Sequence, residues 1–300
     1  MLRALVLSGS AILLLGLRFA WASPQQAEWF QAQLGYYVVL ALLILALAFF
    51  AQVAKARQWI GRTFWREHRL ALLLVAVGTL FLHLHEPHML RVFNDEPTHA
   101  LAALGMHLDK SAMAATVSNY VGETFVTGDP YAITRPILFP LLVSILHDVI
   151  GYRTANVFVL NVLLTPFVLL GGYLLAHRLG GRLAGYVATG LLVTFPLLAQ
   201  NVTSGGYDVL NMALVAALML ATLAYVQSGD EERGPLMNLS LALALLLAAT
   251  RPESVLYLVP WSAATLVLWR RDRHARLTTF AAVSPLFLLP GFMANLHMLR

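Results

Sequence analysis

The sequence contains no cysteine and few charged residues. The absence of cysteine excludes disulfides and thiolate sites, although it does not indicate a compartment. Charged residues make up 12% of the chain and hydrophobic residues 59%, whereas soluble domains have about 25% and roughly 45–50%. This low charge content excludes an ordinary soluble domain and indicates a membrane protein.

Long apolar runs account for most of the hydrophobic residues. Several of them approach or reach the roughly 20 residues that a helix needs to cross a bilayer, and they predict an all-α, polytopic membrane protein with about nine transmembrane helices. The predicted spans are Leu2–Ala22, Leu34–Val53, Leu70–Leu84, Ala155–Ala176, Leu183–Leu198, Val209–Val226, Leu236–Ala249, Val255–Trp269 and Leu277–Leu296. The first is either a span or a signal peptide, because Ala20-Trp21-Ala22 has a small-x-small cleavage pattern.

Basic residues predict the orientation of these spans. One short loop contains Lys55, Arg57, Arg62, Arg66 and Arg69, and such clusters are typical of cytoplasmic loops. The formal net charge of +5 is therefore attributed to these loops and not to nucleic-acid binding. Residues 1–69 are predicted to form N-terminal spans and a basic cytoplasmic loop, and residues 70–300 a transmembrane core with an outer loop over residues 86–153.

Within the outer loop, Pro136–Ile150 is apolar enough to resemble a further span. At about 1.5 Å per residue, however, its helix would cover only about 22 Å of a roughly 30 Å hydrocarbon core. Ser144, His147 and Asp148 fall on one helical face, as expected for a helix in the membrane interface. A crossing here would also turn Arg178 and Arg182 outward. The segment is therefore predicted to be an interfacial helix on the outer surface.

Two adjacent carboxylates, Asp95 and Glu96, begin this outer loop's most polar stretch. Neighbouring residues do not share a helix face, so the pair is suited to a loop or a helix start, where one side chain faces a substrate and the other braces the backbone. The alternative is a simple helix N-terminus, with Asn94 or Asp95 as the cap and Pro97 in the first turn. The two interpretations are compatible.

Further polar residues are predicted to lie in the same outer layer. Arg251 and Glu253 occupy a tight turn between two short spans, so the turn is expected to lie below the lipid headgroups. An arginine at that depth is costly unless it is paired or faces water. The alternative is that the Arg251–Glu253 pair only reaches toward the interface. The remaining outer candidates are Arg135, before the interfacial helix, Asp129, and the Tyr207-Asp208 pair at another outer turn.

Histidines raise the question of a metal site. His83, His85 and His88 lie near Glu86, but His83 and His85 point to different helix faces and converge only if the helix has already ended. Asp95, Glu96 and His99 form a second weak set, because carboxylate and imidazole suit several divalent cations. Polar helix faces account for these residues as well. No metal is assigned, and a divalent cation remains an alternative.

The order of these motifs resembles the GT-C superfamily of polytopic glycosyltransferases, and within it the protein mannosyltransferases and lipid A aminoarabinose transferases. The resemblance covers roughly Leu70–Trp269. It is carried by Asp95-Glu96 followed by Ala100-Leu101-Ala102-Ala103, by Arg135-Pro136-Ile137-Leu138-Phe139-Pro140-Leu141-Leu142 running to Gly151, by Ala176-His177-Arg178-Leu179-Gly180-Gly181-Arg182, by Asp208 at the start of a span, and by Arg251-Pro252-Glu253.

The resemblance implies an inverting transferase that moves a sugar from a polyprenyl phosphate to a glycan, lipid or protein acceptor outside a bacterial plasma membrane. It implies that Asp95 is the general base and that Glu96 orients it or the acceptor, and Arg135 and Arg251 are the best candidates to hold the donor phosphate. Lys110 and Arg91 are the next candidates if neither arginine binds it. Arginine suits this role because its fork binds phosphate in a bidentate manner. The expected pocket residues are His99, Asp129, Tyr207, Asp208 and Glu253.

A transporter or flippase of a lipid-linked or anionic substrate is the alternative from another class. Transporters tend to have ionisable groups near the bilayer midplane and internal repeats. The predicted spans are nearly free of charge and no repeat is visible in the sequence. These two features favour the transferase.

The predicted orientation can be measured by cysteine labelling, since the chain has no cysteine of its own. Single cysteines placed within Lys55–Arg69 and Arg270–Arg276 are expected to react from the same side of the membrane. Cysteines in place of Asp95 and Asp208 are expected to react from the other side. Labelling of positions 178 and 95 from one side would mean that Pro136–Ile150 crosses the bilayer.

Overall fold

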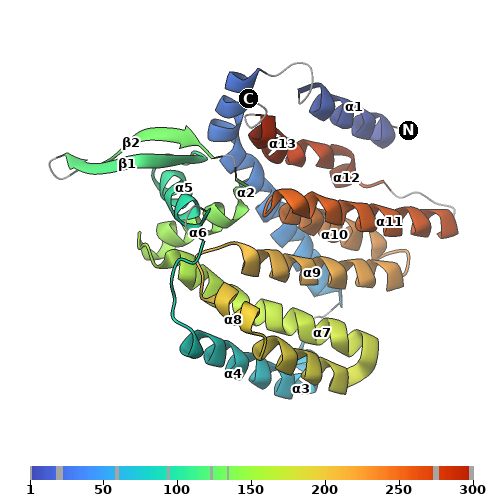
Figure 1. Ribbon diagram of the computed structural model, residues 1–300. Helices are drawn as coiled ribbons and strands as arrows, with labels where there is room; N and C mark the ends of the chain where they lie inside the picture. The colour runs from blue at the N-terminus through green and yellow to red at the C-terminus, as the bar shows by residue number, and fades with distance from the viewer. Residues whose placement is uncertain are drawn as a thin grey trace. The chain divides into compact units, whose positions relative to one another are not determined.

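The computed structural model (Figure 1) describes residues 2–17, 23–57, 61–92, 95–121, 124–133, 135–272 and 277–296. The chain folds into two compact units. Unit 1 comprises Met1–Leu47, Thr98–Tyr152 and Leu241–Arg300, and unit 2 comprises Ala48–Pro97 and Arg153–Ser240. Several residues used in the sequence analysis lie outside the described residues: Ala20–Ala22, Asn94, Arg273 and Arg276.

The predicted helical class is confirmed, but the prediction of about nine spans is not supported. Within the described residues, three helices are long and apolar enough to cross a membrane: α2 (Pro24–Arg57), α7 (Asn156–Val193) and α9 (Asp208–Gln227). Shorter apolar helices are α1 (Leu2–Gly16), α4 (Arg69–His85), α6 (Leu138–Ile150) and α10 (Arg233–Ala248). Their lengths fall below the roughly 20 residues of a typical crossing.

Proline shortens the helices near the C-terminus. The predicted span Leu277–Leu296 consists of α12 (Thr279–Val283), the 3-10 helix η3 (Ser284–Leu288) and α13 (Leu289–Leu296). Pro285 and Pro290 stand at the starts of the last two, where the missing N–H of proline interrupts a continuous α-helix. Likewise, Val255–Trp269 is divided between the 3-10 helix η2 (Pro252–Tyr257) and α11 (Leu258–Asp272).

Helix α7 contains the break that the sequence predicted between two of its spans. Gly181 has φ 80° and ψ −174°, a conformation that glycine adopts readily because it has no Cβ. The two arms fold back on each other, since a Cβ on Gly185 would lie 2.7 Å from the ring of Tyr173 and one on Gly172 2.5 Å from Leu192 Cδ1. Arg178 and Arg182 flank this turn.

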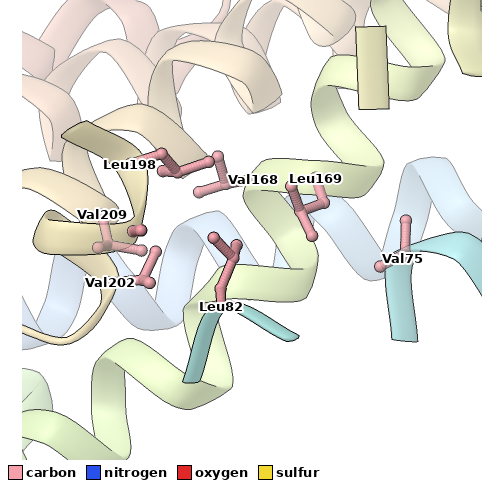
Figure 2. Close-up of a cluster of buried hydrophobic side chains, with 8 residues drawn as sticks. Val75, Leu82, Val168, Leu169, Leu198, Val202 and Val209 are labelled. Atoms are coloured by element: carbon pink, nitrogen blue, oxygen red, sulfur yellow. The ribbon is translucent and has the colours of Figure 1, made fainter. Parts of the chain in front are cut away.

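Unit 2 is built from α4, α7, α9 and two short helices, α3 (Arg62–Glu67) and α8 (Pro196–Val202). Its core is formed by apolar side chains of α4, α7, α8 and α9 (Figure 2): Val75, Leu82, Val168, Leu169, Leu198, Ala199, Val202 and Val209. Glycines let the helices approach closely. A Cβ on Gly78 would lie 2.5 Å from Val193 Cγ2, and one on Gly171 would lie 2.7 Å from Ala216 Cβ.

In unit 1, the first helix packs against the last ones. Leu14 of α1 is buried with Ala27, Leu289 and Met293, and Ser10 Oγ donates to the Ala282 carbonyl at 2.7 Å. The sequence segment that has the pattern of a signal peptide therefore contributes to the core of this unit.

A β-hairpin in unit 1 was not predicted. It follows α5 (Asp95–Asp109) and consists of β1 (Met113–Val121) and β2 (Thr124–Ala132), which pair antiparallel from Met113↔Ala132 to Val121↔Thr124 (Figure 1). Its base is attached to α2, because the Ala112 N–H donates to the Ala32 carbonyl at 2.8 Å and the Ile133 N–H donates to the Ala112 carbonyl at 3.4 Å. The hairpin ends at Ala132, three residues before Arg135.

The segment predicted to be an interfacial helix, Pro136–Ile150, contains helix α6 (Leu138–Ile150), but two of the three residues of its predicted polar face are buried. Ser144 and His147 are buried, because Ser144 Oγ donates to the Leu141 carbonyl at 2.8 Å and the His147 ring packs against His107 and Tyr152. Only Asp148 of the three predicted polar residues is exposed.

Candidate functional site

The predicted site residues are divided between the two units. Asp95, Glu96, Tyr207 and Asp208 belong to unit 2, whereas His99, Asp129, Arg135, Arg251 and Glu253 belong to unit 1. Asp129 lies on β2 beside Gly128, which pairs with Val117. His99 is buried in α5 with its ring 5.9 Å from that of Phe139.

Helix α5 begins at the predicted carboxylate pair. Asp95 and Glu96 form its first turn, with Pro97 after them, so the predicted helix start with Pro97 in the first turn is confirmed, whereas the predicted cap is not tested. Acidic side chains are favoured at this end because the helix dipole is positive there. Asp95 is half-buried, while Glu96 is 2% exposed.

Glu96 braces two loops of unit 2. Its Oε2 accepts the Arg91 backbone N–H at 2.9 Å and the Gly205 backbone N–H at 3.1 Å. Gly205 cannot be enlarged without displacement, since a Cβ there would lie 2.8 Å from Leu90 Cδ2. A buried carboxylate with two amide donors is well satisfied. The prediction left open which carboxylate of the pair braces the backbone, and these bonds assign that position to Glu96.

Around the Gly205-Gly206 turn, the structure brings two predicted site residues together. A Cβ on Gly206 would lie 3.5 Å from Glu96 Oε1 and 3.7 Å from Asp208 Oδ2. Asp208 is half-buried in the first turn of α9. Because Gly206 has no side chain, the space between the carboxylates of Glu96 and Asp208 is left unfilled at this point.

Sequence reasoning missed Asn161, which holds this turn from α7. Its Nδ2 donates to the carbonyls of Ser204 at 2.8 Å and Gly206 at 2.9 Å. Arg91, an alternative phosphate ligand in the sequence analysis, contacts the same region through Nη2, which lies 3.3 Å from Glu86 Oε2 and 3.1 Å from Thr203 Oγ1. A lone asparagine in an apolar run is the only signal that pointed to Asn161.

Lys110, the other alternative, is engaged in unit 1. Its Nζ lies 2.7 Å from Asp148 Oδ2, and His107 Nδ1 lies 2.6 Å from Asp148 Oδ1. Burial raises the pKa of the Asp148 carboxyl, but the bonds from Lys110 and His107 outweigh it and hold that pKa below its ordinary value. This cluster fastens α5 to α6.

The predicted histidine set is only partly assembled. Because α4 ends at His85, His88 turns back so that its Nε2 lies 3.1 Å from His83 Nδ1, and His83 Nε2 lies 2.9 Å from Thr165 Oγ1. His85 instead stacks on Phe81. Within the described part of the chain, no group of three or more potential ligands is arranged to hold a metal ion.

Arg251 and Glu253 form the pair that the sequence offered as an alternative. Arg251 Nε lies 3.6 Å from Glu253 Oε2, and the Glu253 side chain is 71% exposed. An exposed pair of this kind contributes roughly 0–1 kcal/mol to stability. The pair itself therefore adds little to stability.

Arg135 lies in the wall of a cavity in unit 1. The cavity has a volume of about 110 Å³ and is lined by α2, the segment after the hairpin, the end of α10, η2, η3 and α13. Its lining residues are Gln31, Val39, Arg135, Pro136, Ile137, Leu245, Ala248, Ala249, Val255, Phe287, Leu288, Pro290, Gly291 and Phe292. Only Gln31 and Arg135 among these have polar side chains.

Comparison with known proteins found no family model, no curated protein and no solved structure that matches the chain.

The role of Glu96 can be separated from that of its neighbour. Glu96→Ala is expected to leave the buried Gly205 N–H and the partly buried Arg91 N–H without this acceptor, at roughly 1–3 kcal/mol for the buried one, and to lower the midpoint of thermal unfolding in detergent. Glu96→Gln retains an oxygen and is expected to change it little. Glu253→Ala is the exposed control. An unchanged midpoint in Glu96→Ala would contradict the bracing role.

Proposed function

We propose that the chain is a membrane glycosyltransferase that takes a sugar from a polyprenyl-phosphate donor. The observation that supports this most is Arg135 in the wall of an otherwise apolar cavity. A cavity of that kind suits an amphiphile with an anionic group, because the guanidinium pairs with phosphate while the apolar walls bind the adjoining chain. Lipid-phosphate sugars have this combination of groups.

Of the acidic pair, Asp95 is assigned as the general base. Glu96 is already bonded to two backbone amides, so its role is to position the start of α5. In the proposed step, Asp95 takes the proton of an acceptor hydroxyl as that oxygen attacks the anomeric carbon. The bond between the sugar and the phosphate oxygen breaks, and the lipid phosphate leaves with the bonding electrons.

We assign arginine side chains the role of stabilising the leaving phosphate. Negative charge develops on the departing phosphate, and a preorganised cation stabilises it in the transition state. Arg135 is the first candidate because it borders the cavity. Arg251 is the second candidate, because arginine binds phosphate with a bidentate fork.

The reaction class is tested by incubating membranes that contain the protein with radiolabelled polyprenyl-phosphate sugars. Transfer predicts that the label leaves the lipid fraction. Label that crosses the membrane while it remains on the lipid would instead identify a flippase. Retention of the label in its original place with every lipid-linked sugar supplied would contradict the proposal.

Replacement of Asp95 tests the assigned base. Asp95→Asn preserves the shape of the side chain and its place at the helix start, but it cannot accept the proton, so transfer is expected to fall by roughly 10²–10⁴-fold. Donor binding and the unfolding midpoint are expected to stay near those of the wild type. Asp109→Asn, the same change at an exposed position of the same helix, is the control. Full activity of Asp95→Asn would remove Asp95 as the base.

Lysine substitutions test the arginines. Arg135→Lys and Arg251→Lys keep the charge but lose the bidentate fork, and a charged hydrogen bond is worth roughly 1.5–3 kcal/mol. Donor KM is therefore expected to rise by about 10–100-fold, with the larger effect at Arg135. Arg153→Lys, at an exposed position, is the control. Normal donor use by both variants would mean that the phosphate is bound elsewhere.

A further inference from the structure

Four arginines lie at one end of unit 2, and neither its core nor the proposed reaction accounts for them. Arg66 belongs to α3 and Arg69 begins α4, whereas Arg178 and Arg182 flank the turn of α7 at Gly181. The two basic segments are far apart in the sequence, but α3, the start of α4 and the turn of α7 lie at the same end of the unit (Figure 1). We call this region the basic end of unit 2.

A cluster of rings joins the two basic segments. His68, which stands between Arg66 and Arg69, is buried, and its Nδ1 lies 3.1 Å from the hydroxyl oxygen of Tyr173. The His68 ring is 5.3 Å from the ring of His177, which stacks on Tyr173. The arginines of α3 and α4 are therefore held near those of the α7 turn.

The charges of both segments act on His68. Burial is the largest cause that lowers the pKa of His68, followed by the nearby His177; Glu67 raises this pKa and Arg182 lowers it. Arg182 is thus close to the junction of α3 and α4, although it lies beyond the turn of α7. Glu67 is the single acid within residues 66–69 and 178–182, so the basic end has a positive net charge.

The four arginines of the basic end are available to a partner. All of them are exposed, and none of them is paired with a carboxylate of the described residues. Trp65, which precedes Arg66, is 53% exposed. Exposed basic residues with an adjacent tryptophan are typical of the level of the lipid headgroups, where cations attract anionic lipids and the indole ring has both an apolar and a polar neighbour.

Apolar side chains are exposed next to these arginines. Leu70 and Leu73 follow Arg69 on α4, and Leu179 and Leu183 follow Arg178 and Arg182 in α7. Each of these four leucines is at least 49% exposed. A soluble anion, a nucleic acid or an acidic protein would leave them in water, whereas the acyl chains of a lipid would cover them. Charge and apolar surface together therefore favour a lipid as the partner.

Helix α4 separates the basic end from the acidic residues of unit 2. His68, before α4, meets Tyr173, whereas His83 Nε2, near the end of α4, lies 2.9 Å from Thr165 Oγ1. The 17 residues of α4 extend for about 25 Å at 1.5 Å per residue. The arginines thus lie at the end of α4 opposite to the loop that leads to Glu96, as the positive-inside bias predicts for a cytoplasmic surface.

From this arrangement we propose that the basic end of unit 2 binds the headgroups of anionic phospholipids in the cytoplasmic leaflet. The headgroup phosphate pairs with arginines of both segments, and the acyl chains lie on the exposed leucines. This site is separate from the residues assigned to sugar transfer. It depends on the membrane location of the chain and not on transferase activity.

Two lipids that share their chains and differ in headgroup charge test the proposal. Dioctanoyl phosphatidylglycerol and dioctanoyl phosphatidylcholine are added to the full-length protein in a neutral detergent, and their dissociation constants are measured by native mass spectrometry. The wild type is expected to bind phosphatidylglycerol at least about fivefold more tightly, the effect of one basic residue near an anionic lipid. This preference is expected to fall as ionic strength rises. Equal affinities would overturn the proposal.

Arg66→Gln and Arg178→Gln each remove one charge, from different segments. Each is expected to weaken phosphatidylglycerol binding by about fivefold and to leave phosphatidylcholine binding unchanged, whereas Arg178→Lys is expected to bind both lipids as the wild type does. Arg153→Gln, at an exposed position before α7, is the control for net charge. An equal loss in Arg153→Gln, or a loss in only one of the two segments, would contradict a site shared by both.

Inorganic phosphate distinguishes a lipid site from a site for a soluble anion. Ammonium phosphate in place of ammonium acetate, at equal ionic strength, is expected to leave phosphatidylglycerol bound, because phosphate has no chains to cover the leucines. Displacement of the lipid by phosphate would overturn the assignment to lipid. Sugar transfer is measured in none of these experiments, so failure of the transferase proposal would not alter their outcome.

Discussion

The hydrogen bonds of one buried carboxylate, that of Glu96, hold together the loops at the polar end of unit 2. Glu96 Oε2 joins the Arg91 and Gly205 amides, and these belong to loops that are far apart in the sequence. Both loops run into helices that start with an acid, Asp95 in α5 and Asp208 in α9. In a chain with so few charges, a carboxylate that is out of water must have strong partners. The backbone amides of Arg91 and Gly205 are these partners. Their bonds to Glu96 therefore position the loops that lead into α5 and α9.

Inside the apolar helices, polar side chains are satisfied locally and glycines set the spacing. Thr165 Oγ1 donates to the Asn161 carbonyl one turn earlier at 2.7 Å, and Asn161 closes the turn that bears Gly205. Gly78, Gly171 and Gly185 remove side chains where helices meet. Close backbone approach of this kind is typical of helix packing in membranes, where van der Waals contact replaces the hydrophobic driving force.

The sequence predicted the helical class and several boundaries because apolar periodicity and glycine act locally. Val209–Val226 matches α9, and the basic segment predicted between the spans Ala155–Ala176 and Leu183–Leu198 contains the break in α7 at Gly181. Helix starts such as Asp95 were also predictable from capping chemistry. The hairpin was missed although β-branched and aromatic residues recur over Met113–Ala132 around a Gly-Glu pair, a pattern typical of strands. The burial of His147, the engagement of Arg91 and the cavity at Gln31 depend on tertiary contacts, which no local pattern encodes.

The hairpin also limits how deeply this part of unit 1 could enter a lipid bilayer. Both outer edges of a two-stranded sheet present backbone N–H and C=O groups, and such edges do not occur against lipid hydrocarbon. Strands of nine residues extend for about 30 Å at roughly 3.3 Å per residue, a length that would have to lie in water or headgroups in the proposed membrane protein. Because Ala112 bonds to Ala32 at the hairpin's base, the same arrangement would hold the first turns of α2 at the bilayer surface.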